Sequence, residues 1–456
     1  MRQMKQIKNA PVQKNDAITL SIDTLTSEGA GVGRMNGYTV FVNGALPGET
    51  VQAHVIKVTS TYAVAKVTEV LIASPSRTQP RCPVFNQCGG CTLQHLSYPA
   101  QLATKQQQVL DALTRLGGFT DIPMHDICGM EEPWHYRNKG SFPFGTAGGG
   151  AVFGFFAERS HRLVPFADCP IQDKRIVEIA QKVCAWANEH DISVYNEETH
   201  AGSLRHVMAR ATATGETMAV IVTNGPLKQA DALISALDGI NSIWHNENSR
   251  DTNAIFGQFF THLAGQPTLT ECIGDNRFSV SPQSFLQVNA VQTSLLYGFA
   301  VQFLNPQPTE TVVDAYCGIG TISLLLAERC ARVIGIEQVP EAIADAKKNA
   351  AENHIQNASF LCGAVEAILP ELFINDQMPN AVVLDPPRKG CEETALAAIC
   401  KAGISRLVYV SCNPSTLARD LKYLSAHGYV LQAVQPVDMF PHTSHVETVV
   451  LMSKVR

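Results

Sequence analysis

Short strands rich in β-branched residues, separated by stretches with helical periodicity, fill the last third of the sequence. From about residue 308 these strand segments are TVVDA, RVIGIE, AVVLD, RLVYVS and ETVVLM. Such alternation is typical of a doubly wound sheet of parallel strands, because a crossover helix has to return the chain before each new parallel strand. We therefore expect an α/β domain over residues 291–456.

The front of the chain has a different pattern. Residues 16–72 alternate apolar and polar positions in short runs that are broken by Gly, Asn and Pro-Gly. This pattern predicts about five antiparallel strands, enough for a small closed barrel of the oligonucleotide-binding type, and we assign residues 1–74 to it. Residues 75–290 hold a cysteine-rich turn, a helical run over about 98–116 and mixed strands and helices. We interpret this region as a central α+β domain.

Length, charge and cysteine content narrow the class of protein. A chain of 456 residues is longer than one hydrophobic core usually organises, so several domains are expected. No apolar run is long enough for a membrane span, and the start lacks the apolar core of a signal peptide. We expect a cytoplasmic protein without membrane contact, in which the 13 cysteines stay reduced. The net charge is −6, but residues 1–80 carry eight Lys and Arg against five Asp and Glu, which is compatible with phosphate contacts.

A glycine-rich turn follows the first strand of the α/β domain. In VVDAYCGIGTISLLLA the strand ends at Asp314, and Gly318 and Gly320 lead into a helix. Glycines at such a turn let a ligand approach the backbone, although many strand-to-helix turns use glycine for packing alone. The next strand ends at Glu337, whose carboxylate can accept hydrogen bonds from ribose hydroxyls. Together these features indicate a cofactor that contains a nucleoside.

The later strands narrow the choice of cofactor. VVLDPPRKG places Asp385 at a strand end, and two prolines hold the following turn extended. This segment resembles the fourth motif of S-adenosylmethionine-dependent methyltransferases, and DAYCGIGT resembles their first motif. The third glycine of dinucleotide-binding turns is replaced by Ser323, which argues against a dinucleotide. Enzymes of this fold that methylate exocyclic base amines usually carry an aromatic residue where this chain has Arg388.

A cysteine, Cys412, lies where the strand RLVYVS ends and a helix is about to begin. Most free cysteines are buried core residues, but this turn is polar, and amides at the helix start would favour a thiolate. Carbon 5 of uracil becomes nucleophilic only after a nucleophile adds to carbon 6, and a base must later remove the carbon 5 proton. Cys412 fits the first role. Glu447 in PHTSHVETVVLM is the candidate base, with His442 and His445 as competitors.

Five ordered segments resemble the RNA uracil-5-methyltransferase family over nearly the whole chain: SPQSFLQVN, DAYCGIGTISLLLA, LDPPRKG, YVSCNPSTLARDL and PHTSHVETVVLM. The resemblance implies a class I, Rossmann-like methyltransferase domain that forms 5-methyluridine on a flipped-out uridine. It also implies that Cys412 is the nucleophile and Glu447 the general base. The predicted S-adenosylmethionine contacts are Gln287, Tyr316, Glu337 and Asp385 by this match, together with the turn of Gly318 and Gly320, while Thr321 stands where some members have Asn.

A second group of cysteines lies in the central domain. Cys82, Cys88 and Cys91 follow a C-x5-C-x2-C spacing beside two glycines, and Cys169 follows in PFADCPIQ. Clustered cysteines in a reducing compartment indicate a metal centre, and zinc would use the same ligands as an iron-sulfur cluster. In the resembling family all four positions match the ligands of a [4Fe-4S] cluster. We therefore favour this cluster over zinc, in a structural or RNA-positioning role.

The resemblance also bears on the RNA. The barrel resembles a TRAM domain, which grips RNA, and members that act on transfer RNA usually lack both the barrel and the cysteine cluster. This implies 23S ribosomal RNA as the substrate, bound by a monomer without an obligate protein partner, with transfer RNA as the alternative. A second alternative is an RNA-binding ribosome-assembly factor without turnover, although a degenerate site would be expected to have lost Cys412, Asp385 or Glu337. RNA enzymes that methylate cytosine typically carry a second cysteine where this chain has Arg388, which favours uracil.

Basic and aromatic residues gather between the cysteine cluster and the α/β domain. They could stack on bases and neutralise phosphates, or form a strand-rich core with exposed cations. These residues are Trp134, Tyr136, Arg137, Lys139, Phe155 and Arg159.

Overall fold

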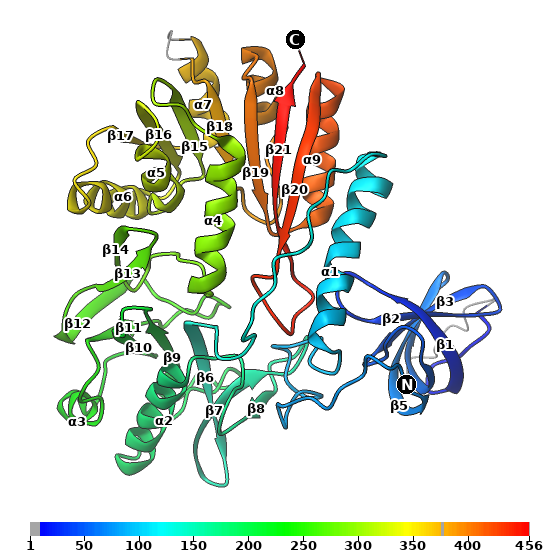
Figure 1. The fold of residues 1–456 in the computed structure, drawn as a ribbon. Coiled ribbons are helices and arrows are strands. Elements are labelled where there is room, and N and C mark those ends of the chain that lie inside the picture. The colour runs from blue at the N-terminus through cyan, green and yellow to red at the C-terminus, as the bar shows by residue number, and fades with distance from the viewer. Residues whose placement is uncertain (1–9, 375–377, 456) are drawn as a thin grey trace. The chain divides into compact units, whose positions relative to one another are not determined.

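The computed structural model describes residues 10–374 and 378–455 (Figure 1). The chain forms two compact units, which are Met1–Gln108 with Phe440–His445 and Val109–Met439 with Val446–Arg456. In the described parts of the chain, no helix combines the length and the apolar character that a membrane crossing requires. The division into three domains stays a prediction.

The first unit contains a closed barrel of five strands in the order β1-β2-β3-β5-β4, which confirms the predicted barrel. Its strands are β1 (Ala17–Leu25), β2 (Gly31–Met35), β3 (Tyr38–Asn43), β4 (Thr50–Val58) and β5 (Tyr62–Ile72). Along β1, Ile18, Leu20 and Ile22 are buried and the residues between them are exposed, because successive side chains of a strand point to opposite faces. β3 and β5 pair in parallel, unlike the other neighbours, and this pairing closes the sheet.

The same unit includes Phe440–His445, a segment that lies far along the chain from the barrel. The amides of Thr92 and Leu93 donate to the carbonyl of His442, at 3.0 and 2.9 Å. The side chain of Gln101, on α1 (Tyr98–Ala112), accepts from the amide of His442 at 2.9 Å and contacts its ring Nδ1 at 3.2 Å. α1 continues into a π-helical turn, η1 (Leu113–Gly117), so the helix predicted over about 98–116 is confirmed.

The second unit begins with a mostly antiparallel sheet in the order β12-β11-β10-β9-β6-β7-β8, in which only β10 and β11 are parallel. Its strands are β6 (Lys139–Ala147), β7 (Gly150–Phe156), β8 (Leu163–Pro165), β9 (Leu204–Ala211), β10 (Thr217–Thr223), β11 (Ser242–Glu247) and β12 (Phe259–Gly265). Helix α2 (Lys174–Glu189) packs on this sheet and contacts α3 (Ala230–Ala236). A hairpin of β13 (Leu269–Ile273) and β14 (Asn276–Val280) follows, and its Leu269 packs with Met208, Met218 and Val220. The predicted mixture of strands and helices in this region is confirmed.

The second sheet of this unit has the strand order β17-β16-β15-β18-β19-β21-β20, which confirms the predicted doubly wound α/β fold (Figure 1). Its strands are β15 (Thr311–Ala315), β16 (Arg332–Glu337), β17 (Ala358–Cys362), β18 (Ala381–Leu384), β19 (Arg406–Ser411), β20 (Tyr429–Val437) and β21 (Glu447–Lys454). The helices are α4 (Ala290–Leu304), α5 (Thr321–Ala327), α6 (Pro340–Glu352), α7 (Val365–Ile374), α8 (Glu393–Ala402) and α9 (Pro414–Ala426).

One strand of this sheet differs from the prediction. The segment ETVVLM was expected to form a parallel strand, but β21 is antiparallel to both β19 and β20. No crossover helix lies between β20 and β21, so the chain turns back and the second strand has to run the opposite way. This reversal decides which end of β21 reaches the candidate site.

Candidate active site

Three predicted site residues meet at one edge of the doubly wound sheet. β18 and β19 are parallel neighbours, so Asp385 and Cys412, which directly follow them, lie at the same edge. β21 enters at this edge from the opposite direction, and its register pairs Thr448 with Ser411. Glu447, the first residue of β21, therefore lies beside the strand end that Cys412 follows.

Cys412 is half-buried between the end of β19 and the start of α9. Burial raises the pKa of its thiol to about 11, and the charge of Glu447 acts in the same direction, whereas the charge of Arg388 lowers it. The expectation that the helix start would favour a thiolate is therefore wrong for the ligand-free protein, because burial and a neighbouring carboxylate outweigh the helix amides. Asn413 caps α9, and its Oδ1 accepts from the amide of Ser415 at 3.0 Å.

Glu447 is only 3% exposed, because β21 lies between β19 and β20 and is not an edge strand. Burial raises the pKa of its carboxyl to about 8, the charge of Asp385 adds to this shift, and the charge of Arg388 opposes it. At neutral pH the carboxyl is largely protonated. In its ionised form it is a stronger base than an exposed glutamate.

Two more carboxyls are disfavoured in their ionised form. Burial raises the pKa of Asp385 to about 7, and the charge of Asp314 adds to the shift. The pKa of Asp314 is likewise raised by burial to about 7, and its Oδ2 accepts from the hydroxyl of Ser323 at 2.6 Å. Ser323, which replaces the third glycine of a dinucleotide turn, thus binds the carboxyl at the end of β15. Proton-holding carboxyls are the common feature of this edge.

Arg388 supplies the positive charge of the site. Its side chain is exposed, yet its charge lowers the pKa of both Cys412 and Glu447. The carbonyl of Arg388 accepts from Nδ2 of Asn413 and from Oγ1 of Thr416, both at 3.2 Å. The first turn of α9 therefore holds the turn that carries Arg388. In the sequence, Arg388 served only as an argument against other substrates. Its influence on Cys412 was not predicted.

A buried carboxylate on α9 braces the same turn. Asp420 Oδ2 accepts from the amide of Cys391 at 2.8 Å and from the hydroxyl of Tyr409 at 2.6 Å, and Oδ1 accepts from Nε of Arg419 at 2.7 Å. Arg419 in turn donates to the carbonyl of Lys389 at 2.9 Å. Sequence analysis missed Asp420, because an aspartate inside an amphipathic helix ordinarily reads as part of the solvated face.

Glu337 lies against the glycine turn. Oε2 of Glu337 accepts from the amide of Gly318 at 3.3 Å, and Oε1 accepts from the amide of Val339 at 2.9 Å. Gly318 has a φ of 54°, and no atom lies within 4 Å of the position that a Cβ would take there. Tyr316 also has a left-handed φ, 68°, which is uncommon for an aromatic residue and frequent at ligand-binding turns. The open space beside this turn, with a half-buried carboxylate next to it, fits the nucleoside part of a cofactor.

The remaining predicted cofactor contact, Gln287, is half-buried in the loop between β14 and α4. Tyr297, buried on α4, lies among the predicted site residues. Burial raises the pKa of its hydroxyl, as do the charges of Asp385 and Glu447, while hydrogen bonds with Thr321 and Gln287 act in the opposite direction. Tyr297 was missed because an aromatic residue within an apolar helix ordinarily reads as core.

The competing bases belong to the first unit, in Phe440–His445. The ring Nδ1 of His442 lies 3.2 Å from Nε2 of Gln101, which occupies that nitrogen. Glu447 is the candidate base whose charge acts on Cys412.

The four predicted metal ligands are divided between the two units. Cys82, Cys88 and Cys91 belong to the first unit and Cys169 to the second. Across residues 10–374 and 378–455, no three His, Cys, Asp or Glu side chains are arranged to hold a metal ion. Burial raises the pKa of Cys88, and the charge of Cys82 adds to the shift. The assignment of these four cysteines to a cluster stays a prediction, and we assign no chemical step to one.

Comparisons with known proteins agree with this architecture. The family model "tRNA (Uracil-5-)-methyltransferase" matches residues 273–455, and the TRAM domain model matches residues 11–68. Proteins from Bacillus cereus and Halalkalibacterium halodurans, both described as uncharacterized RNA methyltransferases, are each 46% identical over 98% of both chains. The crystal structure of Pyrococcus abyssi tRNA (uracil-54, C5)-methyltransferase in complex with S-adenosyl-L-homocysteine is 27% identical, with a TM-score of 0.77. It covers 95% of this chain and 100% of its own.

A doubly wound sheet with a glycine turn and carboxylates at its strand ends, together with these relatives, defines an S-adenosylmethionine-dependent RNA methyltransferase. More narrowly, the chain belongs to the RNA uracil-5-methyltransferase family, and the resemblance found in the sequence is confirmed. The TRAM assignment of the barrel is confirmed as well.

The raised pKa of Glu447 predicts that this residue destabilises the ligand-free protein at alkaline pH. Folding favours the protonated carboxyl, so its contribution to stability is complete below the usual value near 4.5 and is lost as pH rises through about 8. Glu447→Gln is neutral throughout. The difference in free energy of unfolding between Glu447→Gln and the wild type should shift in favour of the variant by more than about 1 kcal/mol from pH 5 to pH 8. One pKa unit corresponds to about 1.4 kcal/mol.

Thermal and urea unfolding at pH 5, 6.5 and 8 measure this difference, with the exposed Glu393→Gln of α8 as the matched control. Parallel pH profiles for Glu447→Gln and the wild type would contradict the prediction.

Proposed function

We propose that this protein transfers a methyl group from S-adenosylmethionine to carbon 5 of a uridine in 23S ribosomal RNA and so forms 5-methyluridine. The observation that carries the proposal is the meeting of Cys412, Glu447 and Asp385 at one sheet edge, where the charge of Arg388 acts on Cys412 and Glu447. A sulfur nucleophile and a carboxylate base are the two groups that addition at carbon 6 and proton removal from carbon 5 require.

Cys412 begins the reaction. Its thiol has to lose a proton before the sulfur can bond to carbon 6 of the uracil, and burial makes that loss unfavourable. The guanidinium of Arg388 favours the thiolate, and solvent takes the proton that the thiol releases. Glu447 also has to release its own proton to solvent before it can act as the base. When the sulfur–carbon bond forms, electron density moves to carbon 5 of the ring and makes that carbon nucleophilic.

Glu447 completes the reaction. After methyl transfer, carbon 5 carries both a proton and a methyl group. The ionised carboxylate of Glu447 takes the proton, the electron pair of the broken bond restores the double bond to carbon 6, and the carbon–sulfur bond breaks to return Cys412 as a thiolate. The raised pKa of Glu447 suits this role, because it makes the carboxylate a stronger base.

The proposed cofactor residues surround the glycine turn. When bound, S-adenosylmethionine supplies the methyl group. Glu337 is positioned by the amides of Gly318 and Val339 and has lone pairs left for ribose hydroxyls. The full set that we propose to hold the cofactor is Gln287, Tyr316, Gly318, Gly320, Glu337 and Asp385.

The choice between RNA classes depends on the barrel and the cysteine motif. Both features favour 23S ribosomal RNA through the family resemblance. However, the archaeal transfer RNA enzyme aligns over 95% of this chain, so the barrel alone does not separate the two classes. Transfer RNA is therefore the second candidate substrate.

Methylation assays should distinguish these substrates and test the nucleophile. We expect the protein to place labelled methyl groups on 23S ribosomal RNA as 5-methyluridine and to leave transfer RNA unlabelled. Cys412→Ala should lose activity by several orders of magnitude, because nothing then activates carbon 5. Cys272→Ala, on β13, is the matched control and should keep the activity. If only transfer RNA is labelled, the proposed 23S ribosomal RNA substrate is wrong and transfer RNA is the substrate. Full activity of Cys412→Ala would exclude a covalent intermediate with this cysteine.

Glu447→Gln should trap the covalent intermediate. Its amide cannot take the carbon 5 proton, so the Cys412–uracil bond should form and persist after methyl transfer. A protein–RNA species that survives denaturing electrophoresis should accumulate to about one RNA per protein. The double variant Cys412→Ala, Glu447→Gln should form none, and Glu393→Gln should turn over normally. Release of product by Glu447→Gln at the wild-type rate would remove Glu447 from the base role.

We also propose that Cys82, Cys88, Cys91 and Cys169 bind a [4Fe-4S] cluster, with zinc as the alternative. The spacing of the cysteines and the family resemblance support this proposal. Protein prepared without oxygen should contain about four iron and four acid-labile sulfide per chain. Cys88→Ser should lose both, and Cys184→Ser, on α2, should keep them. Stoichiometric zinc, or a chain without metal, would contradict the cluster.

A further inference from the structure

Two cations, Lys139 and Arg210, lie directly opposite each other on the neighbouring strands β6 and β9. Arg210 is only 2% exposed. Its Nη2 donates to the carbonyl of Ser284 at 2.7 Å, but its Nε and Nη1 have no hydrogen-bond partner among the described residues. Like charges across a ladder destabilise a sheet, and buried donors are normally paired. This cation pair therefore lacks an evident structural explanation within the sheet.

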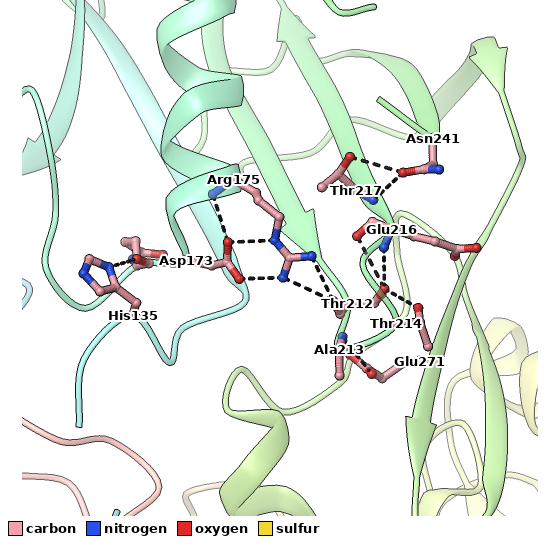
Figure 2. Close-up of polar contacts among 11 residues, drawn as sticks. His135, Asp173, Arg175, Thr212, Ala213, Thr214, Glu216, Thr217, Asn241 and Glu271 are labelled. Atoms are coloured by element: carbon pink, nitrogen blue, oxygen red, sulfur yellow. Dashed lines mark hydrogen bonds and ion pairs between the residues drawn. The ribbon is translucent and has the colours of Figure 1, made fainter. Parts of the chain in front are cut away.

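Two carboxylates of this region, Asp173 and Glu271, are already engaged by other groups (Figure 2). Asp173 binds Arg175 through both oxygens, at 3.0 and 2.6 Å. Glu271 is buried and accepts from the amide of Ala213 at 3.1 Å. The charge of Glu271 favours the protonated form of Arg210, and burial raises the pKa of Glu271. Neither carboxylate forms an ion pair with Arg210.

Lys139 is half-buried, so solvent reaches it while Arg210 lies covered beside it. Apart from burial, the groups that act on the proton affinity of Lys139 are two cations, Arg210 and Arg137. Three positive charges thus gather here, and no carboxylate of the described residues forms an ion pair with Lys139.

Hydrogen bonds from Arg210 and from Asn138, which lies between Arg137 and Lys139, join this region to the loop between β14 and α4. The carbonyl of Ser284 receives the hydrogen bond from Arg210, and the carbonyl of Val288 receives one from the amide of Asn138 at 2.8 Å. The same loop carries Gln287, one of the proposed cofactor contacts. The cation group is therefore part of the unit that holds the candidate active site.

We propose that Lys139, Arg210 and Arg137 form a binding site for a phosphodiester group of the RNA substrate, beside the loop between β14 and α4. This inference rests on the proposed RNA substrate. A phosphate is the anion that every RNA strand brings, and Lys and Arg are the residues that bind it. Lys139 contacts the phosphate, and the covered guanidinium of Arg210 adds positive charge behind it. A phosphate held here fixes the strand from which the target uridine has to be flipped.

Such a site gives RNA binding a characteristic pH dependence. Burial and the charges of Arg210 and Arg137 lower the pKa of Lys139 to about 8. Lys139 is charged below that pH and loses its charge above it, so the affinity for RNA should fall as pH rises from 7 to 9. Lys139→Arg should lose this part of the pH dependence, because a guanidinium stays charged over the whole range.

Binding of 23S ribosomal RNA to the intact protein, measured at several salt concentrations and at pH 7 and 9, tests the site. Lys139→Gln should weaken binding at pH 7 and lower the slope of log affinity against log salt by about one. Lys139→Arg should keep the wild-type slope. Lys182→Gln removes the same charge from α2, where the amino group donates to the carbonyl of Asp238 at 3.2 Å, and should change neither quantity.

Arg210→Met provides a second, independent variant. Without the cation behind it, Lys139 should hold its proton to higher pH, so the fall in RNA affinity should move toward the usual lysine pKa of 10.5. Thermal unfolding shows whether Arg210→Met is folded. If it is not, the Lys139 variants still test the site.

The outcomes separate this inference from the proposed function. Equal salt slopes and equal pH profiles for the wild type, Lys139→Gln and Lys139→Arg would overturn the phosphate site, whatever RNA the protein methylates. If Lys139→Gln lowers the slope as expected but no RNA acquires 5-methyluridine, the phosphate site stands and the proposed function fails.

Discussion

The pairing of β21 with β19 is the constraint on which the candidate site depends. β21 is the strand that runs against its neighbours, so its first residue reaches the edge where the parallel strands end. Glu447 thereby comes beside Cys412, although the two residues approach the edge from opposite directions. Because side chains alternate along a strand, a shift of one residue in this register would turn Glu447 to the other face of the sheet. Hydrogen bonds of the backbone thus set the distance between the proposed nucleophile and its base.

Burial then sets the chemistry of this edge. The pKa values of Asp314, Asp385, Glu447 and Cys412 are all raised. Near neutral pH the three carboxyls therefore hold protons to a larger extent than exposed carboxyls would. Arg388 opposes the shifts at Cys412 and Glu447, and α9 holds its turn in place. A cation bound at this edge would favour the ionised carboxylates and so lower these raised pKa values. The proposed phosphate site, in contrast, is built on a different sheet where cations outnumber the available carboxylates.

Local signals in the sequence were sufficient for much of the fold. Alternating apolar residues predicted the barrel, and β-branched strands with crossover helices predicted the doubly wound sheet. Asp385 and Cys412 could be placed because each directly follows a recognisable parallel strand. The direction of β21 could not be read from its own residues, since it depends on the connection from β20. The pKa of Cys412 was also misjudged, because it depends on burial and on Glu447, which lies on another strand. The cysteine spacing predicted metal ligands, and this assignment stays a prediction, because spacing alone does not determine how side chains are arranged.

The segment Phe440–His445 bears on how this architecture can be altered or inherited. It joins β20 to β21 in the chain, yet its backbone partners are Thr92 and Leu93, and Gln101 brackets His442. A chain truncated before Val109 would retain the segment and lose all three partners. The N-terminal unit is therefore not a detachable module. A chimera that replaces the barrel with another RNA-binding domain therefore has to replace the segment Phe440–His445 as well. This segment ends two residues before Glu447, the proposed catalytic base.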